Sequence, residues 1–207
     1  MTFKEIDGIV KHYEEEIDGC VDLMKNINKN LKKEKDEKVI AAFEHTNSML
    51  EFACFVSACY IDLLCTYRNL RRAKTEWEYS YNAKIAYLLI YETINTYHKY
   101  QKKIYQEANK IEKENYNHYF QMLNDELREF KEDYGYDKIM SRIRNKSIAH
   151  YDRNFIDFYE NYEILKDKKS NDVIESFFYF MKPLLHFSYG LIGGNINRES
   201  FALSWLM

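Results

Sequence analysis

The sequence predicts an all-α protein, an elongated antiparallel bundle of four or more helices. The chain of 207 residues contains one Pro and six Gly, so few residues interrupt a helix. Apolar side chains recur in alternating steps of four and three, the period of a helix that packs one face against others. No stretch alternates apolar and polar residues as a half-buried strand does. A chain of this length fits one domain, so residues 1–207 are taken as a single helical domain.

The first two predicted helices cover residues 3–33 and 38–70. The charged run 32–38 predicts a solvated connection between them. In the second helix, Phe43, Leu50 and Leu64 widen the apolar stripe, so we expect burial on more than one side. The first stripe consists of Ile6, Val10, Tyr13, Ile17, Cys20, Met24, Ile27 and Leu31.

A third helix is predicted over residues 79–113 and a fourth over 114–133, ending near Tyr134-Gly135. At ~1.5 Å per residue the third helix would be roughly 50 Å long. Three helices of similar length with one apolar stripe each favour an elongated antiparallel bundle.

The chain is predicted to resume a helix at Tyr136 and to follow it into a polar segment. A final helix is predicted from about residue 172, with Ser170 or Asn171 as its N-cap. Pro183 is expected to kink this helix, and glycines at 190, 193 and 194 to end it. We expect the apolar segment 201–207 to pack on the bundle or on a second subunit.

Composition narrows the functional classes. The formal net charge of −3 argues against a uniformly basic surface that coats duplex nucleic acid, although it allows a local basic cleft. No metal-ligand spacing and no glycine-rich phosphate loop occur, so no metal or cofactor is expected. The four cysteines form no C-x-x-C pair, and buried reduced thiols are expected. They are Cys20, Cys54, Cys59 and Cys65.

The start of the chain has no signal-peptide core, and no apolar run is expected to approach the roughly 18 residues that cross a bilayer. We therefore expect a cytoplasmic protein with no membrane association.

One polar stretch brings a cation, an amide, a hydroxyl, an imidazole and a carboxylate together. It reads Arg144-Asn145-Lys146-Ser147-Ile148-Ala149-His150-Tyr151-Asp152. The N–H donors of the planar arginine guanidinium match phosphate oxygens, and histidine can exchange a proton near neutral pH. Together they are the minimum for cutting RNA without a metal, because the 2′-hydroxyl attacks its own phosphate.

On a straight helix, Arg144 and His150 are separated by roughly 600° of rotation and ~9 Å of rise. Either the helix loosens near Ser147, or the two side chains reach a shared site from adjacent flanks. The alternative is structural: Arg144 pairs with a carboxylate and His150 hydrogen-bonds at a helix end. The residues expected to face the core are Met140, Ile143, Ile148 and Ala149.

The pattern Arg144-Asn145-x-x-x-x-His150 resembles the signature of the HEPN family (higher eukaryotes and prokaryotes nucleotide-binding). That signature has an Arg, a polar residue and a closing His. The ending Ala149-His150-x-Asp152 resembles the form found in abortive-infection systems. The resemblance is local, and the helical frame over roughly residues 60–190 accompanies it.

The resemblance implies a metal-independent endoribonuclease of a prokaryotic defence or toxin system, with RNA as substrate. It also implies a homodimer whose motif faces line a shared cleft, and a cognate antitoxin or defence partner. Arg144 would hold the scissile phosphate, His150 would transfer the proton, and Asn145 would orient the nucleotide or the His. The further substrate-binding candidates are Lys146, Tyr151 and Asp152.

Two alternatives stay open. The first is a catalytically inactive module of the same fold that binds RNA, a nucleotide or a protein partner. The second is a helical interaction protein in which the motif is incidental. Retention of RNA without cleavage would distinguish the first, and unchanged function after mutation of Arg144 and His150 would distinguish the second.

Overall fold

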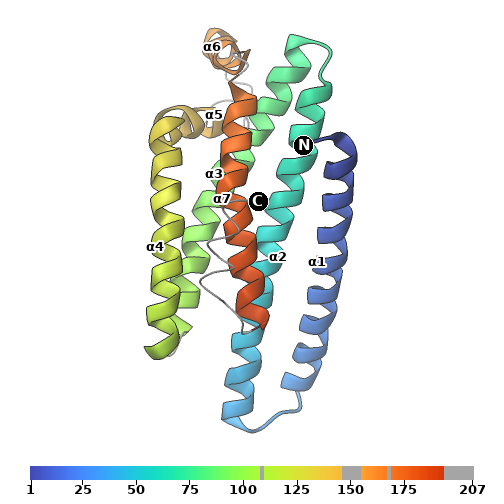
Figure 1. The fold of residues 1–207 in the computed structure, drawn as a ribbon, viewed down its shortest axis with the longest axis vertical. Coiled ribbons are helices and arrows are strands. Elements are labelled where there is room, and N and C mark those ends of the chain that lie inside the picture. Colours follow the sequence, from blue (N-terminus) through green and yellow to red (C-terminus); the bar gives the residue numbers. More distant parts are fainter. Residues whose placement is uncertain (108–109, 146–154, 167–168, 194–207) are drawn as a thin grey trace.

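The structure, a computed structural model, describes residues 1–107, 110–145, 155–166 and 169–193. These ranges are largely helical and contain no strand, which confirms the all-α prediction. The long helices run along the length of the molecule and alternate in direction along the chain (Figure 1), which confirms the elongated antiparallel bundle. They are α1 (Phe3–Leu31), α2 (Glu37–Arg72), α3 (Glu76–Glu107), α4 (Lys110–Asp133) and α7 (Ser170–Gly193).

The first helix starts with a reciprocal cap. The Thr2 hydroxyl accepts a hydrogen bond from the Glu5 backbone N–H at 3.2 Å, and the Glu5 carboxylate accepts one from the Thr2 N–H at 2.6 Å. This arrangement satisfies two backbone donors that the helix itself cannot pair. α1 ends at Leu31 and α2 begins at Glu37, so the charged run is confirmed as their connection.

The central helix of the bundle is α2, which contacts α1, α3 and α7. Its buried residues extend around several faces, as its widened apolar stripe predicted. One stretch of α2 is long and apolar enough to cross a membrane by length and composition alone. The expectation that no apolar run reaches this length is therefore wrong. Of that stretch, 56% is buried inside the bundle, as the position of a core helix requires.

The boundary between the third and fourth helices differs from the prediction. α3 ends at Glu107 and α4 begins at Lys110, whereas the sequence predicted a helix through residue 113. The two helices run in opposite directions (Figure 1). The apolar period continues across this point without a Gly or Pro, so the sequence contains no strong stop signal.

The end of α4 follows the prediction. Gly135 has φ +62°, the only positive φ among the described residues. A Cβ at this position would lie 3.1 Å from Ile139 Cδ1, so the turn requires glycine. The chain then forms a π-helical turn, η1 (Tyr136–Met140), and a short helix, α5 (Ser141–Ile143).

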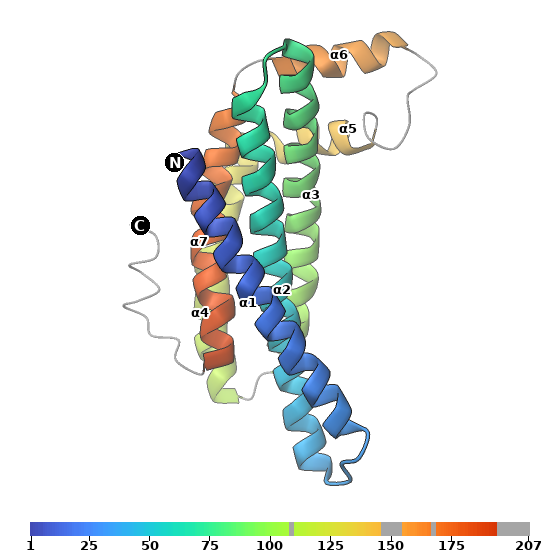
Figure 2. The same cartoon turned by 90° about the vertical axis from the view of Figure 1, so that its right-hand side faces the viewer.

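The last two helices complete the molecule. α6 (Phe155–Lys166) contacts α3 and crosses one end of the bundle (Figure 2). α7 begins at Ser170, and the Val173 N–H donates to the Lys169 carbonyl at 3.0 Å. The prediction of Ser170 or Asn171 as N-cap is therefore wrong, because the helix starts earlier. α7 also continues through Pro183 and past Gly190. The apolar segment 201–207 lies outside the described residues.

All four cysteines are free thiols, but only Cys20 is buried and the others are half-buried. The expectation that all four are buried is thus only partly right. Burial raises the pKa of the Cys59 thiol to about 11. Burial, together with the neighbouring Cys20, raises the pKa of Cys54 to about 12.

We expect these thiols to resist alkylation. A thiol with a pKa about two units above its usual value carries about 100-fold less thiolate near pH 8, and the thiolate is the reactive form. Iodoacetamide should therefore modify Cys59 about 100-fold more slowly in the folded protein than in urea, as mass spectrometry would measure. Cys54, whose pKa is higher still, should react more slowly than Cys59 in the folded protein. Reaction of Cys59 at the denatured rate in the native protein would contradict the burial seen here.

Candidate functional site

The predicted motif begins on the short helical segment that follows α4. Met140 and Ile143 are fully buried, as predicted, and they fix η1 and α5 against α3. Arg144 and Asn145 follow directly and are exposed. The backbone widens to a π-helix at 136–140 and again at 144–145, just before the position where the sequence suggested a loosened helix. Such widened turns are frequent at functional sites.

Arg144 makes three contacts, two of them with α3. Its Nε donates to Glu92 Oε1 at 3.1 Å, and its Nη1 donates to Asn145 Oδ1 at 3.0 Å. Its guanidinium carbon lies 5.7 Å from the ring centroid of Tyr91. Both side chains of the ion pair are about half exposed, at 47% and 48%. Such a pair is worth only about 0–1 kcal/mol to stability, so it orients the guanidinium more than it stabilises the fold.

Asn145 completes the support of Arg144. Its Oδ1 accepts from the guanidinium, and its Nδ2 donates to Ser141 Oγ at 3.4 Å. The amide thus joins Arg144 to the helical turn that precedes it. The resemblance assigned Asn145 to orient a nucleotide or the His, and among the described residues it orients Arg144.

A stack of rings and cations underlies Arg144. The Tyr91 and Tyr136 rings are stacked, with centroids 5.1 Å apart and planes 13° from parallel. Lys131 Nζ lies 5.0 Å from the Tyr136 centroid on this stack. The Tyr136 hydroxyl donates to the Tyr91 carbonyl and to Asn95 Oδ1, each at 3.4 Å. Cation–ring contacts are favourable, so residues of α3, α4 and η1 together support Arg144.

Burial shifts the pKa values of the groups that support Arg144. It raises the pKa of the Tyr136 phenol, and the neighbouring Tyr91 adds to that shift. It lowers the pKa of Lys131 and of His98. The Lys131 ammonium and the His98 ring nitrogen lie 3.3 Å apart. These shifts all favour the neutral form of each group.

The remaining predicted site residues lie outside the described residues. They are Lys146, His150, Tyr151 and Asp152. The approach of His150 to Arg144 therefore stays a prediction. Among the described residues, no three His, Cys, Asp or Glu side chains form a group that could hold a metal ion.

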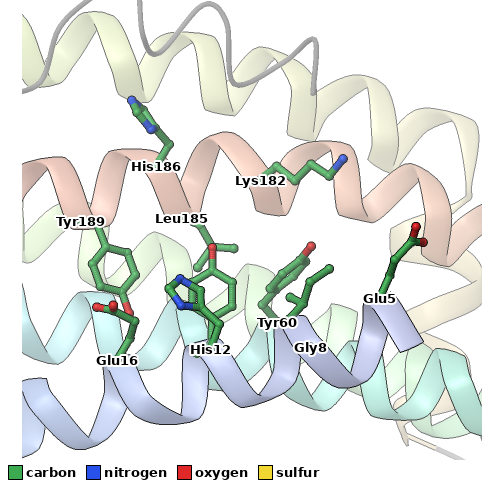
Figure 3. Close-up of a pocket in the computed structure, with 11 residues that line it drawn as sticks. Glu5, Gly8, His12, Glu16, Tyr60, Lys182, Leu185, His186 and Tyr189 are labelled. Atoms are coloured by element: carbon green, nitrogen blue, oxygen red, sulfur yellow. The ribbon is translucent and has the colours of Figure 1, made fainter. Parts of the chain in front are cut away.

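A second candidate site is a groove of about 780 Å³ between α1 and α7 (Figure 3). Tyr60 of α2 and Leu185 of α7 are buried at its base. Glu5, His12 and Glu16 line the α1 wall, and Lys182 and Tyr189 line the α7 wall (Figure 3). Figure 2 places α5 on the α3 side of the bundle, away from this groove.

The sequence analysis missed both the partners of Arg144 and the groove. Glu92 and Tyr91 are more than 50 residues from Arg144 in the chain, and no local pattern connects them. A weak signal for the groove exists, because Gly8, His12 and Glu16 interrupt the α1 surface beside its apolar stripe. No family model, no curated protein and no solved structure matches this chain.

Proposed function

We propose that this protein is a metal-independent endoribonuclease of the HEPN type, acting in the cytoplasm in a prokaryotic defence or toxin system. The observation that carries the proposal is the exposed, pre-oriented guanidinium of Arg144 with Asn145 beside it. This pair opens the segment whose sequence resembles the family signature. An arginine fixed before its ligand arrives loses less conformational freedom on binding, which suits a residue that positions a phosphate.

The contacts of Arg144 leave part of its guanidinium available. Glu92 uses the Nε edge and Asn145 uses one Nη1 hydrogen. Nη2 has no hydrogen-bond partner among the residues that the structure describes. Phosphate is best held by two parallel N–H groups of one guanidinium. In the proposal, Nη2 and the second Nη1 hydrogen hold two oxygens of the scissile phosphate.

The chemistry follows from the absence of metal-ligand spacing in the sequence. His150, or its copy in a second subunit, removes the proton from the ribose 2′-hydroxyl. The 2′-oxygen then bonds to phosphorus while the bond from phosphorus to the 5′-oxygen breaks. The second imidazole protonates the leaving 5′-oxygen, and the product carries a 2′,3′-cyclic phosphate. Arg144 stabilises the charge that develops on the phosphate.

This chemistry predicts a homodimer through the motif face. One subunit supplies a single acid-base group, His150. Two subunits together supply a base and an acid, and their two Arg144 side chains double the positive charge that faces the phosphate. We expect sedimentation velocity at micromolar concentration to show a dimer. A monomer under those conditions would contradict this arrangement.

One observation favours the alternative of a catalytically inactive module. Arg144 already pairs with Glu92, as the structural interpretation of the motif expected. A carboxylate beside the guanidinium weakens the attraction for phosphate. A module of this kind would bind RNA, a nucleotide or a protein partner without cutting RNA.

Expression of the protein in bacteria distinguishes the nuclease from the binding module. The wild type should arrest growth and degrade RNA within the cell, whereas the His150→Ala variant should do neither. RNA integrity is followed on gels alongside growth curves, and immunoblots show that both proteins accumulate equally. Growth arrest by both proteins with intact RNA would contradict the nuclease and favour the binding module.

A further inference from the structure

The groove between α1 and α7 has the shape of a helix-binding site. Its lining positions on α1 recur at helical spacing from Glu5 through Gly8, His12 and Glu16. At ~1.5 Å per residue this interval extends about 16 Å, or three turns. The wall from α7 follows the same direction (Figure 3). A groove between two roughly aligned helices with a third helix beneath it accommodates a further helix along its length.

The base of the groove is apolar and aromatic. Tyr60 is 4% exposed and Leu185 is 3% exposed. Tyr13 and Tyr60 meet edge to face with centroids 5.6 Å apart. The Tyr189 hydroxyl and Ser57 Oγ are hydrogen-bonded at 2.9 Å, so this ring is fixed at one end of the base. Rigid aromatic surfaces of this kind bind apolar side chains at a small entropic cost.

The α1 wall is acidic, because Glu5 and Glu16 are the charged side chains that it contributes to the groove. The capping contacts with Thr2 lower the pKa of Glu5, which keeps this carboxylate charged. The opposite wall carries Lys182. A ligand that fits both walls has an apolar stripe and positive charge on the side that faces α1.

We propose that this groove binds an amphipathic helix of another protein, with a three-turn apolar stripe and Lys or Arg along the flank that faces α1. The acidic α1 wall disfavours a nucleic acid in the same place, because it faces phosphates with carboxylates. It also disfavours a second copy that pairs α1 with α1, since like charges would face one another. This interaction site is separate from the Arg144 site and does not depend on the proposed nuclease.

Gly8 offers a selective way to block the groove. Gly8 lines the groove, and a Cβ built on it meets no atom within 4 Å. A Gly8→Phe side chain therefore has space only by entering the groove or solvent beside it. Gly19 provides the matched control, because it lies on the same helix, has the same open surroundings and does not line the groove.

The test uses the full chain and a fluorescein-labelled synthetic peptide with leucines at helical spacing and lysines along one flank of the leucine stripe. A second peptide replaces every lysine with glutamate. Fluorescence anisotropy should show binding of the lysine peptide at least about tenfold tighter than the glutamate peptide. Gly8→Phe should weaken that binding at least about tenfold, and Gly19→Phe by less than about twofold. Circular dichroism melts of both variants confirm that they are folded.

Four results would overturn the proposal. Equal binding by Gly8→Phe and the wild type would place the peptide elsewhere, and preference for the glutamate peptide would reverse the assigned charge. A wild-type dimer that Gly8→Phe dissociates would assign the groove to a second copy. A Trp205→Ser change in the full chain that tightens peptide binding about tenfold would assign the groove to the chain's own C-terminal segment.

Discussion

The Phe187→Ala variant is expected to lose about 3–5 kcal/mol of unfolding free energy. Phe187 lies on α7 and is fully buried. Its ring meets Phe120 at 5.0 Å and Phe52 at 6.4 Å, both nearly edge to face, and Tyr119 at 5.5 Å. These neighbours come from α2 and α4, so the ring joins three helices. Its removal leaves a cavity that rigid aromatic neighbours cannot fill.

Urea denaturation followed by circular dichroism measures this loss. Tyr179→Ala is the matched control, because Tyr179 lies on the same helix and is 58% exposed. It should change the unfolding free energy by no more than about 0.5 kcal/mol. A loss below about 1 kcal/mol for Phe187→Ala would mean that α7 does not pack against α2 and α4 in this register.

The Arg144→Lys variant should lose RNA cleavage at least about tenfold while its thermal midpoint barely changes. Lysine retains the charge but lacks the planar fork that holds two phosphate oxygens together. The ion pair with Glu92 is half exposed, so the fold depends little on it. Initial cleavage rates of both proteins on one RNA, with melts recorded in parallel, provide the measurement.

Arg142→Lys is the control for this substitution. Arg142 lies two residues earlier and pairs with Glu160 at 3.2 Å, outside the set of contacts around Arg144. Cleavage by this variant should remain close to wild type. Unfolding of Arg144→Lys, or equal loss of cleavage in both variants, would make Arg144 a structural residue and contradict its assignment to the phosphate.

The helices could be predicted because the signals for them are local. The spacing of four and three along residues 38–70 identified the buried face of α2, and Gly135 identified the end of α4. The reversal between α3 and α4 was misplaced because its neighbours are good helix formers on both sides. Ser170 resembled an N-cap, but the helix starts at that residue. A preference for a cap is a weak signal that packing can override.

The candidate site could be predicted only in part for the same reason. Arg144 and Asn145 could be predicted because they belong to one short sequence motif, which is recognised by residue type and spacing. Glu92, which orients Arg144, comes from a distant helix and depends on how α5 packs on α3. The groove arises because α1 and α7 both pack on α2 and leave a space between them, which no single segment specifies.

The central claim is that cleavage proceeds through the RNA's own 2′-hydroxyl without a metal. The most direct measurement incubates the purified protein with RNA and with its 2′-deoxy counterpart in EDTA, and identifies the product ends. We expect the RNA alone to be cut, to products with 2′,3′-cyclic phosphate. The rate should change across the His titration range near ~6.5. Cleavage of the 2′-deoxy strand, or loss of activity in EDTA that Mg²⁺ restores, would contradict the mechanism.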